Sequence, residues 1–260
     1  MRLGGRVVLV TGASAGIGAA VAEELAGAGG RLIVHGRDEE RTEAVAKRTG
    51  GMSLLGDLAV PGAATKLADA ALDVHGHIDI VVANAGLGWS GPFAEMTAAD
   101  IDRLVTLDLL APLQLVRRLL PPMLHRGAGH IALVGSIAGR TGVAGEAVYA
   151  ATKAALDVFA ESLRPELRGT GVAVSLTVPG VVDTGFFAAR GRPYDRRRPR
   201  PVPAADVAKA LVGAIALDRA EVWIPGWLRV APAVRALAPG LYRRLATRFG
   251  EQVISRPGGQ

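Results

Sequence analysis

Short apolar runs of strand length alternate with longer amphipathic segments of helix length through most of this chain. The short runs are nearly continuous in Val, Ile and Leu, which is typical of parallel strands buried on both faces. The alternation predicts a single α/β domain with a doubly wound parallel sheet of about seven strands and helices on both faces. The expected strands are 6–10, 31–35, 52–55, 78–83, 130–135, 172–178 and 220–224, and the expected helices are 17–28, 39–49, 63–75, 100–124, 147–168 and 204–217.

Composition narrows the class of protein further. The length of 260 residues suits one domain that buries a core and a cofactor cleft. The absence of cysteine excludes disulfides, thiolate catalysis and Cys-ligated zinc, and His75 and His77 have no third ligand at a metal-like spacing, so we expect no metal site. No signal-like leader and no uncharged run of about 20 residues is present, so we expect a cytoplasmic protein.

A glycine-rich turn with the spacing Gly-x-x-x-Gly-x-Gly, Thr11–Gly18, lies between the first expected strand and the first expected helix. Glycine lets the backbone approach a pyrophosphate, and the helix N-terminus offers free N–H groups and a positive dipole end. Such a turn can merely join a strand to a helix, but its place at the opening of a βαβ unit favours dinucleotide binding. The expected contact residues are Gly12, Ser14, Ala15, Gly16, Ile17 and Gly18.

Further motifs follow in order after the later strands. They are Asp57-Leu58, Asn84-Ala85-Gly86, Ser136, Tyr149-x-x-x-Lys153 and Pro179-Gly180. Together with TGxxxGIG at the first turn, this series resembles the short-chain dehydrogenase/reductase family over about residues 5–225. The resemblance implies a Rossmann-type dinucleotide-binding and catalytic domain over 1–224, with cofactor contacts at Asp57, Leu58, Asn84, Ala85, Gly86, Pro179, Gly180, Val182 and Thr184. Asp57 can equally be a plain turn residue.

The spacing of Tyr149 and Lys153 places both side chains on one face of a helix, so both can point into one cleft. A nearby cation favours phenolate, so we expect Lys153 to lower the pKa of Tyr149 and make it an acid/base. A Tyr-x-x-x-Lys pair alone is mostly structural, but Ser136 ends the preceding strand, where open α/β sheets bind ligands. The resemblance implies that Ser136 bonds the substrate carbonyl and that Lys153 also holds the nicotinamide ribose.

One position departs from the family pattern. Where the family usually has an asparagine that completes a catalytic tetrad, this chain has Asp108. Aspartate can preserve the main-chain geometry of a proton relay, or its carboxylate can raise the pKa of Lys153 or slow the relay. We therefore include Asp108 among the catalytic candidates.

Cofactor choice depends on the residues after the second strand, where NAD-binding proteins place an acid on the ribose 2′-OH. This chain has Gly36 at that position and Arg37 beside it, which favours NADP(H) over NAD(H) because a guanidinium can grip the 2′-phosphate. The alternative is that Arg37 only caps the loop. Asp38 is expected to cap the next helix rather than contact the ribose.

Residues 185–203 are expected to cover the substrate, with Phe186 and Phe187 inside and the arginines outside. With Leu87, Gly88, Trp89 and the segment 137–143, they predict an apolar pocket for a hydrophobic ketone or alcohol, although such residues can also be core. The basic run 190–200 is interpreted as a solvated, mobile loop, or as a contact for an acidic carrier protein or anionic lipid, with nucleic acid the least favoured.

The C-terminal extension, 225–260, mixes apolar residues with arginines and contains Pro239-Gly240, which should break a helix. It is interpreted as packing on its own domain or on another subunit of a homodimer or homotetramer, with peripheral membrane contact as the alternative. The chain is thus expected to be an NADP(H)-dependent oxidoreductase that interconverts a carbonyl and a secondary alcohol, with Tyr149 as acid/base. The alternatives are a 3-ketoacyl-carrier-protein-type reductase and a non-catalytic NADP(H)-binding regulatory protein.

Overall fold

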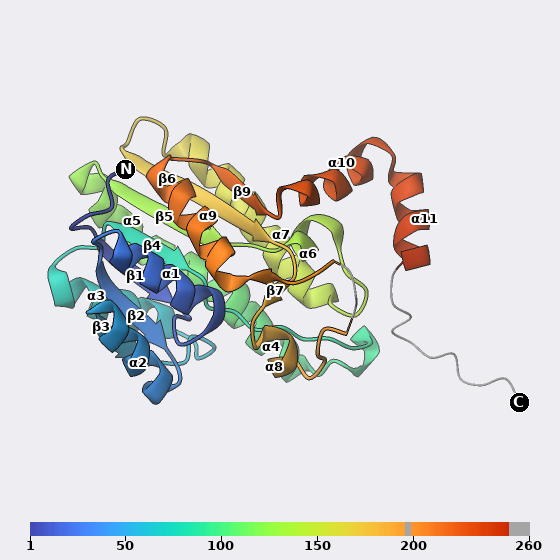
Figure 1. Ribbon diagram of the computed structural model, residues 1–260, viewed down its shortest axis with the longest axis horizontal. Helices are drawn as coiled ribbons and strands as arrows, with labels where there is room; N and C mark the ends of the chain where they lie inside the picture. The colour runs from blue at the N-terminus through green and yellow to red at the C-terminus, as the bar shows by residue number, and fades with distance from the viewer. Residues whose placement is uncertain (196–198, 250–260) are drawn as a thin grey trace, which may run out of the picture.

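The computed structural model describes residues 1–195 and 199–249, and at its centre lies a seven-stranded sheet (Figure 1). The strand order is β3-β2-β1-β4-β5-β6-β9, and every neighbouring pair is parallel. The order runs outward in opposite directions from β1 and β4, which confirms the predicted doubly wound sheet. The strands are β1 Val7–Thr11, β2 Arg31–Gly36, β3 Met52–Leu55, β4 Ile80–Ala83, β5 Gly129–Val134, β6 Val172–Pro179 and β9 Glu221–Ile224.

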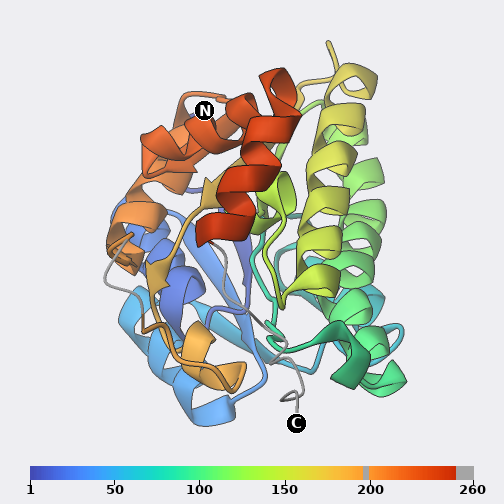
Figure 2. The same ribbon diagram turned by 90° about the vertical axis from the view of Figure 1, so that its right-hand side faces the viewer.

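Two hydrophobic cores lie on the two faces of the sheet, because successive strand residues point in opposite directions. Val7 and Leu9 belong to one core, and Val8 and Val10 belong to the other. Figure 2 shows the resulting helix–sheet–helix layers. One layer holds α1 Gly16–Gly27, α2 Glu39–Thr49 and α9 Ala204–Ala216, and the other holds α3 Ala63–His75, α5 Ala111–Arg126 and α7 Ala147–Glu166.

The long helix predicted over 100–124 is helical throughout but not regular. It consists of α4 Ala98–Val105, a π-helical turn Thr106–Leu110, and α5, with helical backbone at both junctions. A π turn holds an extra residue in one turn of helix, and such turns occur frequently at functional sites. This one carries Asp108, whose exposed fraction is 0%.

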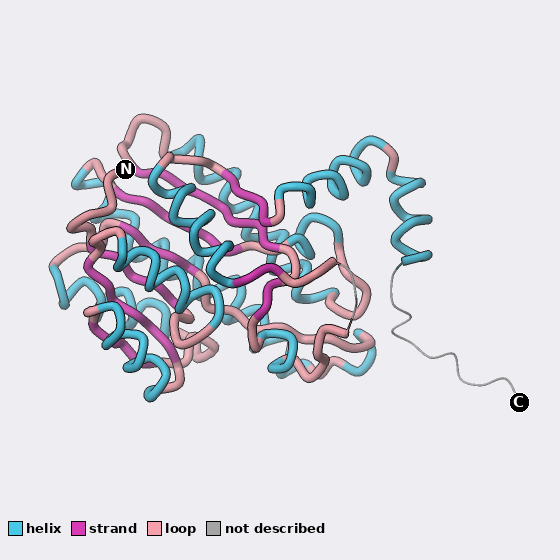
Figure 3. The backbone as a smooth tube through the Cα atoms, viewed as in Figure 1, coloured by secondary structure: helices cyan, strands magenta, loops and turns pink. Residues whose placement is uncertain are grey.

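Short elements that the sequence pattern did not predict gather in the connections beyond the strand ends, most of which are loop (Figure 3). Two of them cover the region above Tyr149: α6 Ile137–Thr141 follows β5, and α8 Phe186–Ala189 follows β6. A separate two-stranded sheet of β7 Val182–Asp183 and β8 Val202–Pro203 ties together the two ends of the expected substrate loop. Another short element is η1 Phe93–Glu95.

A C-terminal arm extends from the body after β9 (Figure 1) and consists of η3 Gly226–Arg229, α10 Val230–Leu237 and α11 Pro239–Phe249. The break falls at the proline, as predicted. The arm rests on α6, since the Arg235 guanidinium donates to the Arg140 carbonyl (2.7 Å) and the Tyr242 hydroxyl donates to the Thr141 carbonyl (2.8 Å). No helix of the described residues is both long and apolar enough to span a bilayer. Residues 196–198 of the basic run and 250–260 of the extension lie outside the described residues.

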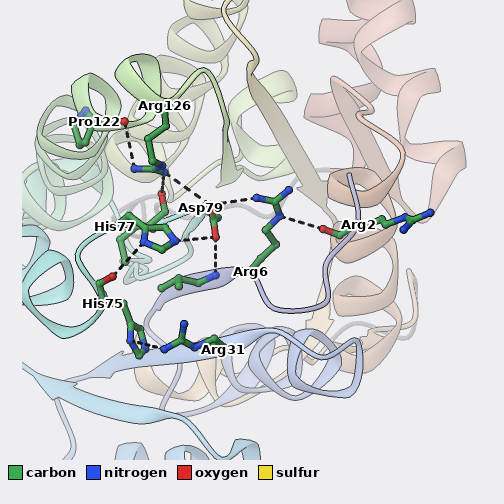
Figure 4. Close-up of polar contacts among 10 residues, drawn as sticks. Arg2, Arg6, Arg31, His75, His77, Asp79, Pro122 and Arg126 are labelled. Carbon is green, nitrogen blue, oxygen red and sulfur yellow. Dashed lines mark hydrogen bonds and ion pairs between the residues drawn. The ribbon is translucent and has the colours of Figure 1, made fainter.

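At the amino edge of the sheet, a buried carboxylate joins several elements (Figure 4). Asp79 precedes β4 and accepts a hydrogen bond from the Val7 backbone N–H of β1 (2.9 Å). The cationic side chains of Arg6 and Arg126 lie 3.5 and 3.9 Å from its Oδ1, and His77 Nε2 lies 3.4 Å from its Oδ2. This Asp79 cluster holds β1, β4 and the end of α5 together at the edge opposite the turn Thr11–Gly18.

Candidate active site

The glycine-rich turn lies at the carboxyl edge of the sheet, between the adjacent strands β1 and β4. The strands that follow them, β2 and β5, lie on opposite sides of this pair, and doubly wound sheets bind ligands at such a point. Gly12 and Gly16 have positive φ values of 65° and 58°. A Cβ on Gly12 would lie 2.7 Å from the Cα of Ala85, and one on Gly18 would lie 2.2 Å from the Gly12 carbonyl oxygen. Side chains are therefore excluded at these positions by the fold itself, and the turn is free to approach a ligand closely.

The N-terminus of α1 is open toward this turn. Its N-cap residue, Ala15, supplies no side-chain hydrogen bond, so the first N–H groups of the helix stay available to an anion. Asn84 has a different task, since its side-chain amide donates to the carbonyls of Thr11 (3.0 Å) and Gly12 (3.1 Å). Asn84 therefore fastens the end of β4 to the turn, and Ala85 packs directly against Gly12.

Space is tight at Gly36, at the end of β2. A Cβ there would lie 2.2 Å from Thr42 Oγ1 and 3.0 Å from Ser14 Cβ, so a larger residue would have to displace these side chains. Arg37, 65% exposed at its side chain, has its Nη1 3.6 Å from Asp57 Oδ2. Asp38 caps α2 by accepting from the Arg41 N–H (3.0 Å), as predicted.

Asp57 accepts a hydrogen bond from the Ala59 N–H (2.9 Å) and so shapes its own turn while holding Arg37. Leu58 is 5% exposed, and its side chain belongs to the hydrophobic core. Next to them, His35 is buried with neither ring nitrogen hydrogen-bonded among the described residues, and burial lowers the pKa of its ring to about 4. In the sequence, His35 stands out only as part of an expected strand.

The three residues of the predicted triad come together at the ends of β5 and α7. Ser136 is a neighbour of the Tyr149 hydroxyl and acts to lower its pKa, and its own Oγ accepts a hydrogen bond from the Ala138 N–H (3.1 Å) at the start of α6. Lys153 Nζ lies 5.7 Å from the centre of the Tyr149 ring and donates to the Val134 carbonyl (3.4 Å). A phenol, a hydroxyl and an ammonium thus lie close together at this edge of the sheet.

Asp108 lies against the ammonium of this group. Its Oδ2 is 3.4 Å from Lys153 Nζ, and its Oδ1 accepts from the Leu87 N–H (2.8 Å). Burial raises the pKa of the Asp108 carboxyl, and the charge of Lys153 opposes that shift. Gly86 completes the contact, since a Cβ there would lie 3.4 Å from both Asp108 Oδ2 and Lys153 Nζ.

The expected lowering of the Tyr149 pKa is wrong for this structure. Burial raises the pKa of the Tyr149 hydroxyl above its usual range, and the negative charge of Asp108 raises it further. The hydrogen bond with Ser136 acts in the other direction but is the smaller effect. The phenol form is therefore strongly favoured at neutral pH.

The segment after β6 closes over the tyrosine. The rings of Phe186 and Tyr149 lie 5.6 Å apart, centre to centre, and Phe186 also packs against Gly88, where a Cβ would lie 2.7 Å from Phe186 Cζ. Thr184 lies beside the glycine turn, with its Cγ2 3.1 Å from a Cβ built on Gly16. Pro179-Gly180 ends β6 under the arm, and Val182 is buried in β7.

An ion pair holds this closed segment in place. The Arg190 guanidinium bonds the Glu146 carboxylate at the start of α7, and it also lies 4.5 Å from the centre of the Phe187 ring. The side chains are only 9% and 12% exposed, so the prediction that the arginines of this loop lie outside is wrong for Arg190. Neither Glu146 nor Arg190 stood out in the sequence, because nothing local connects an acid before one helix to a basic run 44 residues later.

Comparison with known proteins agrees with this arrangement. Residues 6–195 match the family model described as short chain dehydrogenase. The chain belongs to the short-chain dehydrogenase/reductase family. It is similar to the ketoacyl reductase HetN of Nostoc sp., with 36% identity over 85% of this chain and 78% of the relative.

Solved structures of the family show both forms of the nicotinamide cofactor. A short-chain dehydrogenase from Sphingobium yanoikuyae in complex with NADPH has a TM-score of 0.80 and 29% identity, and the match covers 97% of this chain and 99% of that one. A short-chain dehydrogenase/reductase from Burkholderia phymatum in complex with NAD has a TM-score of 0.80 and 26% identity over the whole of both chains. The enzyme is therefore an oxidoreductase of this family, and its preference between the two cofactors has to be argued from its own residues.

Proposed function

We propose that the enzyme reduces hydrophobic ketones to secondary alcohols with NADPH. The observation that carries the proposal is the buried Tyr149 side chain, which has Ser136 and Lys153 as polar neighbours and is enclosed by apolar side chains. A buried phenol that stays protonated at neutral pH is a proton donor, which carbonyl reduction requires.

Ser136, Tyr149 and Lys153 have different roles in this reaction. When bound, the reduced nicotinamide supplies a hydride to the carbonyl carbon. Ser136 and Tyr149 donate hydrogen bonds to the carbonyl oxygen, and Tyr149 gives up its proton as that oxygen takes the electron pair of the C=O bond. Lys153 stabilises the phenolate that remains, binds the ribose hydroxyls and passes a proton back from solvent to Tyr149.

The preference for NADPH rests on Ser14, Gly36 and Arg37. The cradle left by Gly36 excludes an acid, and the exposed Arg37 side chain is held beside it by Asp57. A guanidinium there can bind a 2′-phosphate in two-pronged fashion. We expect Arg37→Ala to weaken NADPH binding about 10- to 100-fold, the equivalent of one lost charged hydrogen bond, while NADH binding changes little. Fluorescence titration measures both, and tighter binding of NADH than NADPH by the wild type would overturn the preference.

The apolar class of substrate follows from the side chains around Tyr149. Leu87, Trp89, Met96 and Phe186 all pack in the cluster that contains it. Turnover of a panel of ketones of increasing apolar size, with Tyr149→Phe as the control, tests the whole proposal. We expect activity to rise with apolar size and to vanish in Tyr149→Phe, which should still bind NADPH. A wild type that binds NADPH but turns over no ketone would favour a regulatory, non-catalytic role.

A second candidate substrate is a ketoacyl chain on an acidic carrier protein. It is favoured by the similarity to a ketoacyl reductase and by the basic run around Arg192 and Arg200. If this is the substrate, reversing the charges at Arg192 and Arg200 raises KM for the carrier-linked ketone and leaves KM for a small ketone unchanged.

Two further predictions concern contacts of the whole molecule. The C-terminal arm is predicted to contact an anionic membrane surface, and the chain is predicted to assemble as a homodimer or homotetramer. The arm exposes Trp227, Val230 and Leu237, and residues 225–249 contain five arginines and no acid. Co-sedimentation with vesicles of anionic and of zwitterionic lipid tests the first, and light scattering tests the second. Binding to neither vesicle would restrict the arm to contacts between protein chains.

A further inference from the structure

The position of Asp108 differs from that of an ordinary core residue. The π turn Thr106–Leu110 brings its carboxylate to the carboxyl edge of the sheet, where the exposed fraction is 0%. Oδ1 is fixed by the Leu87 N–H at 2.8 Å. Oδ2 makes no hydrogen bond to any described residue and faces Lys153 Nζ at 3.4 Å. One oxygen therefore holds the carboxyl in place, and the other is directed at the ammonium of the proposed active site.

Besides the Val134 carbonyl, to which it donates at 3.4 Å, the ammonium of Lys153 has two side chains as neighbours. One is the Tyr149 ring, 5.7 Å away, and the other is the Asp108 carboxylate at 3.4 Å. The negative charge of the carboxylate offsets most of the effect of the Lys153 charge on more distant groups. The interaction is strong because Coulomb energy falls with distance and both groups are shielded from water. Lys153 then has less effect on the Tyr149 oxygen than an unpaired lysine would have.

We propose that Asp108 is a positioning residue that, through Lys153, holds Tyr149 in its proton-donating form and so fits this site for carbonyl reduction over alcohol oxidation. The proposal rests on the proposed function, because it concerns the acid/base step of that reaction. Reduction uses the phenol as donor, whereas oxidation needs a phenolate that accepts the proton from the alcohol. A residue that disfavours phenolate widens the pH range of the first reaction and confines the second to more alkaline pH.

Charged and polar groups face Tyr149 from several elements around it. Glu146 on α7 raises its pKa and Arg190 after α8 lowers it, and these two side chains bond each other, so their charges offset. The Ser136 hydroxyl at the end of β5 lowers the pKa of Tyr149 by hydrogen bonding. Two acidic groups therefore act on Tyr149. Glu146 pairs with Arg190, whereas Asp108 on the π turn pairs with Lys153, a residue of the proposed active site.

The test is Asp108→Asn, which has nearly the same shape and restores the residue that the family pattern has there. We expect the alkaline fall of kcat for ketone reduction and the alkaline rise of kcat for alcohol oxidation to move together to lower pH, by about one to two pH units. Oxidation measured near neutral pH should rise about tenfold or more as a consequence. The matched control is Asp79→Asn, the same change at the other buried aspartate, which should leave both profiles in place.

A second measurement does not depend on turnover. Spectroscopic titration of tyrosinate, with Tyr149→Phe as the blank for the two other tyrosines, gives the ionisation of Tyr149 directly. We expect Asp108→Asn to titrate at lower pH than wild type. Unshifted titration in a variant that still binds NADPH would overturn the proposal and leave Asp108 as a packing residue. If wild type turns over no ketone but Asp108→Asn still titrates at lower pH than wild type, the proposed function is rejected, whereas the effect of Asp108 on Tyr149 stands.

Discussion

The two buried aspartates, Asp79 and Asp108, lie at opposite edges of one sheet and have very different surroundings. The carboxylate of Asp79 has a backbone N–H at 2.9 Å and, within 4 Å, two guanidinium groups and an imidazole. That of Asp108 has one N–H at 2.8 Å and, among the described residues, the single cation of Lys153 at 3.4 Å.

The difference separates a structural carboxylate from one that we propose controls chemistry. Asp79 is surrounded by more positive charge than it carries, and its cationic partners are partly open to water. Asp108 is fully enclosed, and burial raises the pKa of its carboxyl. A charge that is incompletely compensated acts on its neighbours, which at this edge are Lys153 and, beyond it, Tyr149.

Removing one cation from each aspartate gives the largest contrast. Lys153→Met takes the ammonium from Asp108, from the Tyr149 phenolate and from the expected ribose site, so kcat for ketone reduction should fall about 10³-fold. Arg126→Met takes a guanidinium from Asp79 and should leave kcat unchanged. Steady-state kinetics with NADPH at saturation measures both variants. Comparable losses of kcat in the two would show that the edges do not differ in function.

Asp79→Ala should have the second largest effect, on stability. It leaves the Val7 N–H and two guanidinium groups without their shared acceptor, so the free energy of unfolding should fall by about 2 kcal/mol. Urea unfolding measures the loss. Asp79→Asn keeps an acceptor for Val7 and should lose less, and neither variant should change kcat of the folded enzyme. An unfolding midpoint equal to wild type would contradict the structural role of this cluster.

The sheet and the order of its motifs were accessible from the sequence because they depend on local patterns. The runs Val7–Val10 and Ile80–Ala83 are apolar on both faces, and the glycines at 12, 16 and 18 follow from a turn with no room for side chains. The spacing of Tyr149 and Lys153 needs only helical periodicity.

The parts that could not be predicted depend on contacts between distant segments. The pKa of Tyr149 is set by burial under Phe186 and by Asp108, and neither is visible in a Tyr-x-x-x-Lys spacing. The π turn at Thr106–Leu110 keeps the apolar periodicity of an ordinary helix, so sequence pattern does not reveal it. The Arg190–Glu146 pair was hidden in a run of arginines that reads as solvated surface.

Arg190→Gln, at the carboxyl edge, should have a smaller effect than these variants. Without its ion pair to Glu146, the segment carrying Phe186 closes less firmly over Tyr149, so KM for the ketone should rise about fivefold, equivalent to about 1 kcal/mol. We expect kcat to change less than KM, because the groups that transfer the proton stay in place. Arg200→Gln, at an exposed position of the same basic run, is the control for loss of charge, and an equal rise of KM there would remove the special role of Arg190.

The smallest expected effect is a pH dependence of stability that belongs to Asp108 alone, small because Lys153 opposes the effect of burial. Since the pKa of its carboxyl is higher in the folded than in the unfolded state, the folded state binds that proton more tightly. Wild type should therefore gain stability as pH falls through the folded pKa, and the gain is complete below the unfolded value.

Asp108→Asn has no proton to bind at this position, so its unfolding free energy lacks that gain. The raised pKa of Asp157 contributes a similar gain to both proteins and cancels in their difference. Urea unfolding of the two proteins at about pH 7.5 and at about pH 4, near the unfolded value, isolates the contribution of Asp108, and the wild type should improve relative to the variant at the lower pH. A difference that is the same at both pH values would mean that Lys153 fully offsets the effect of burial on Asp108.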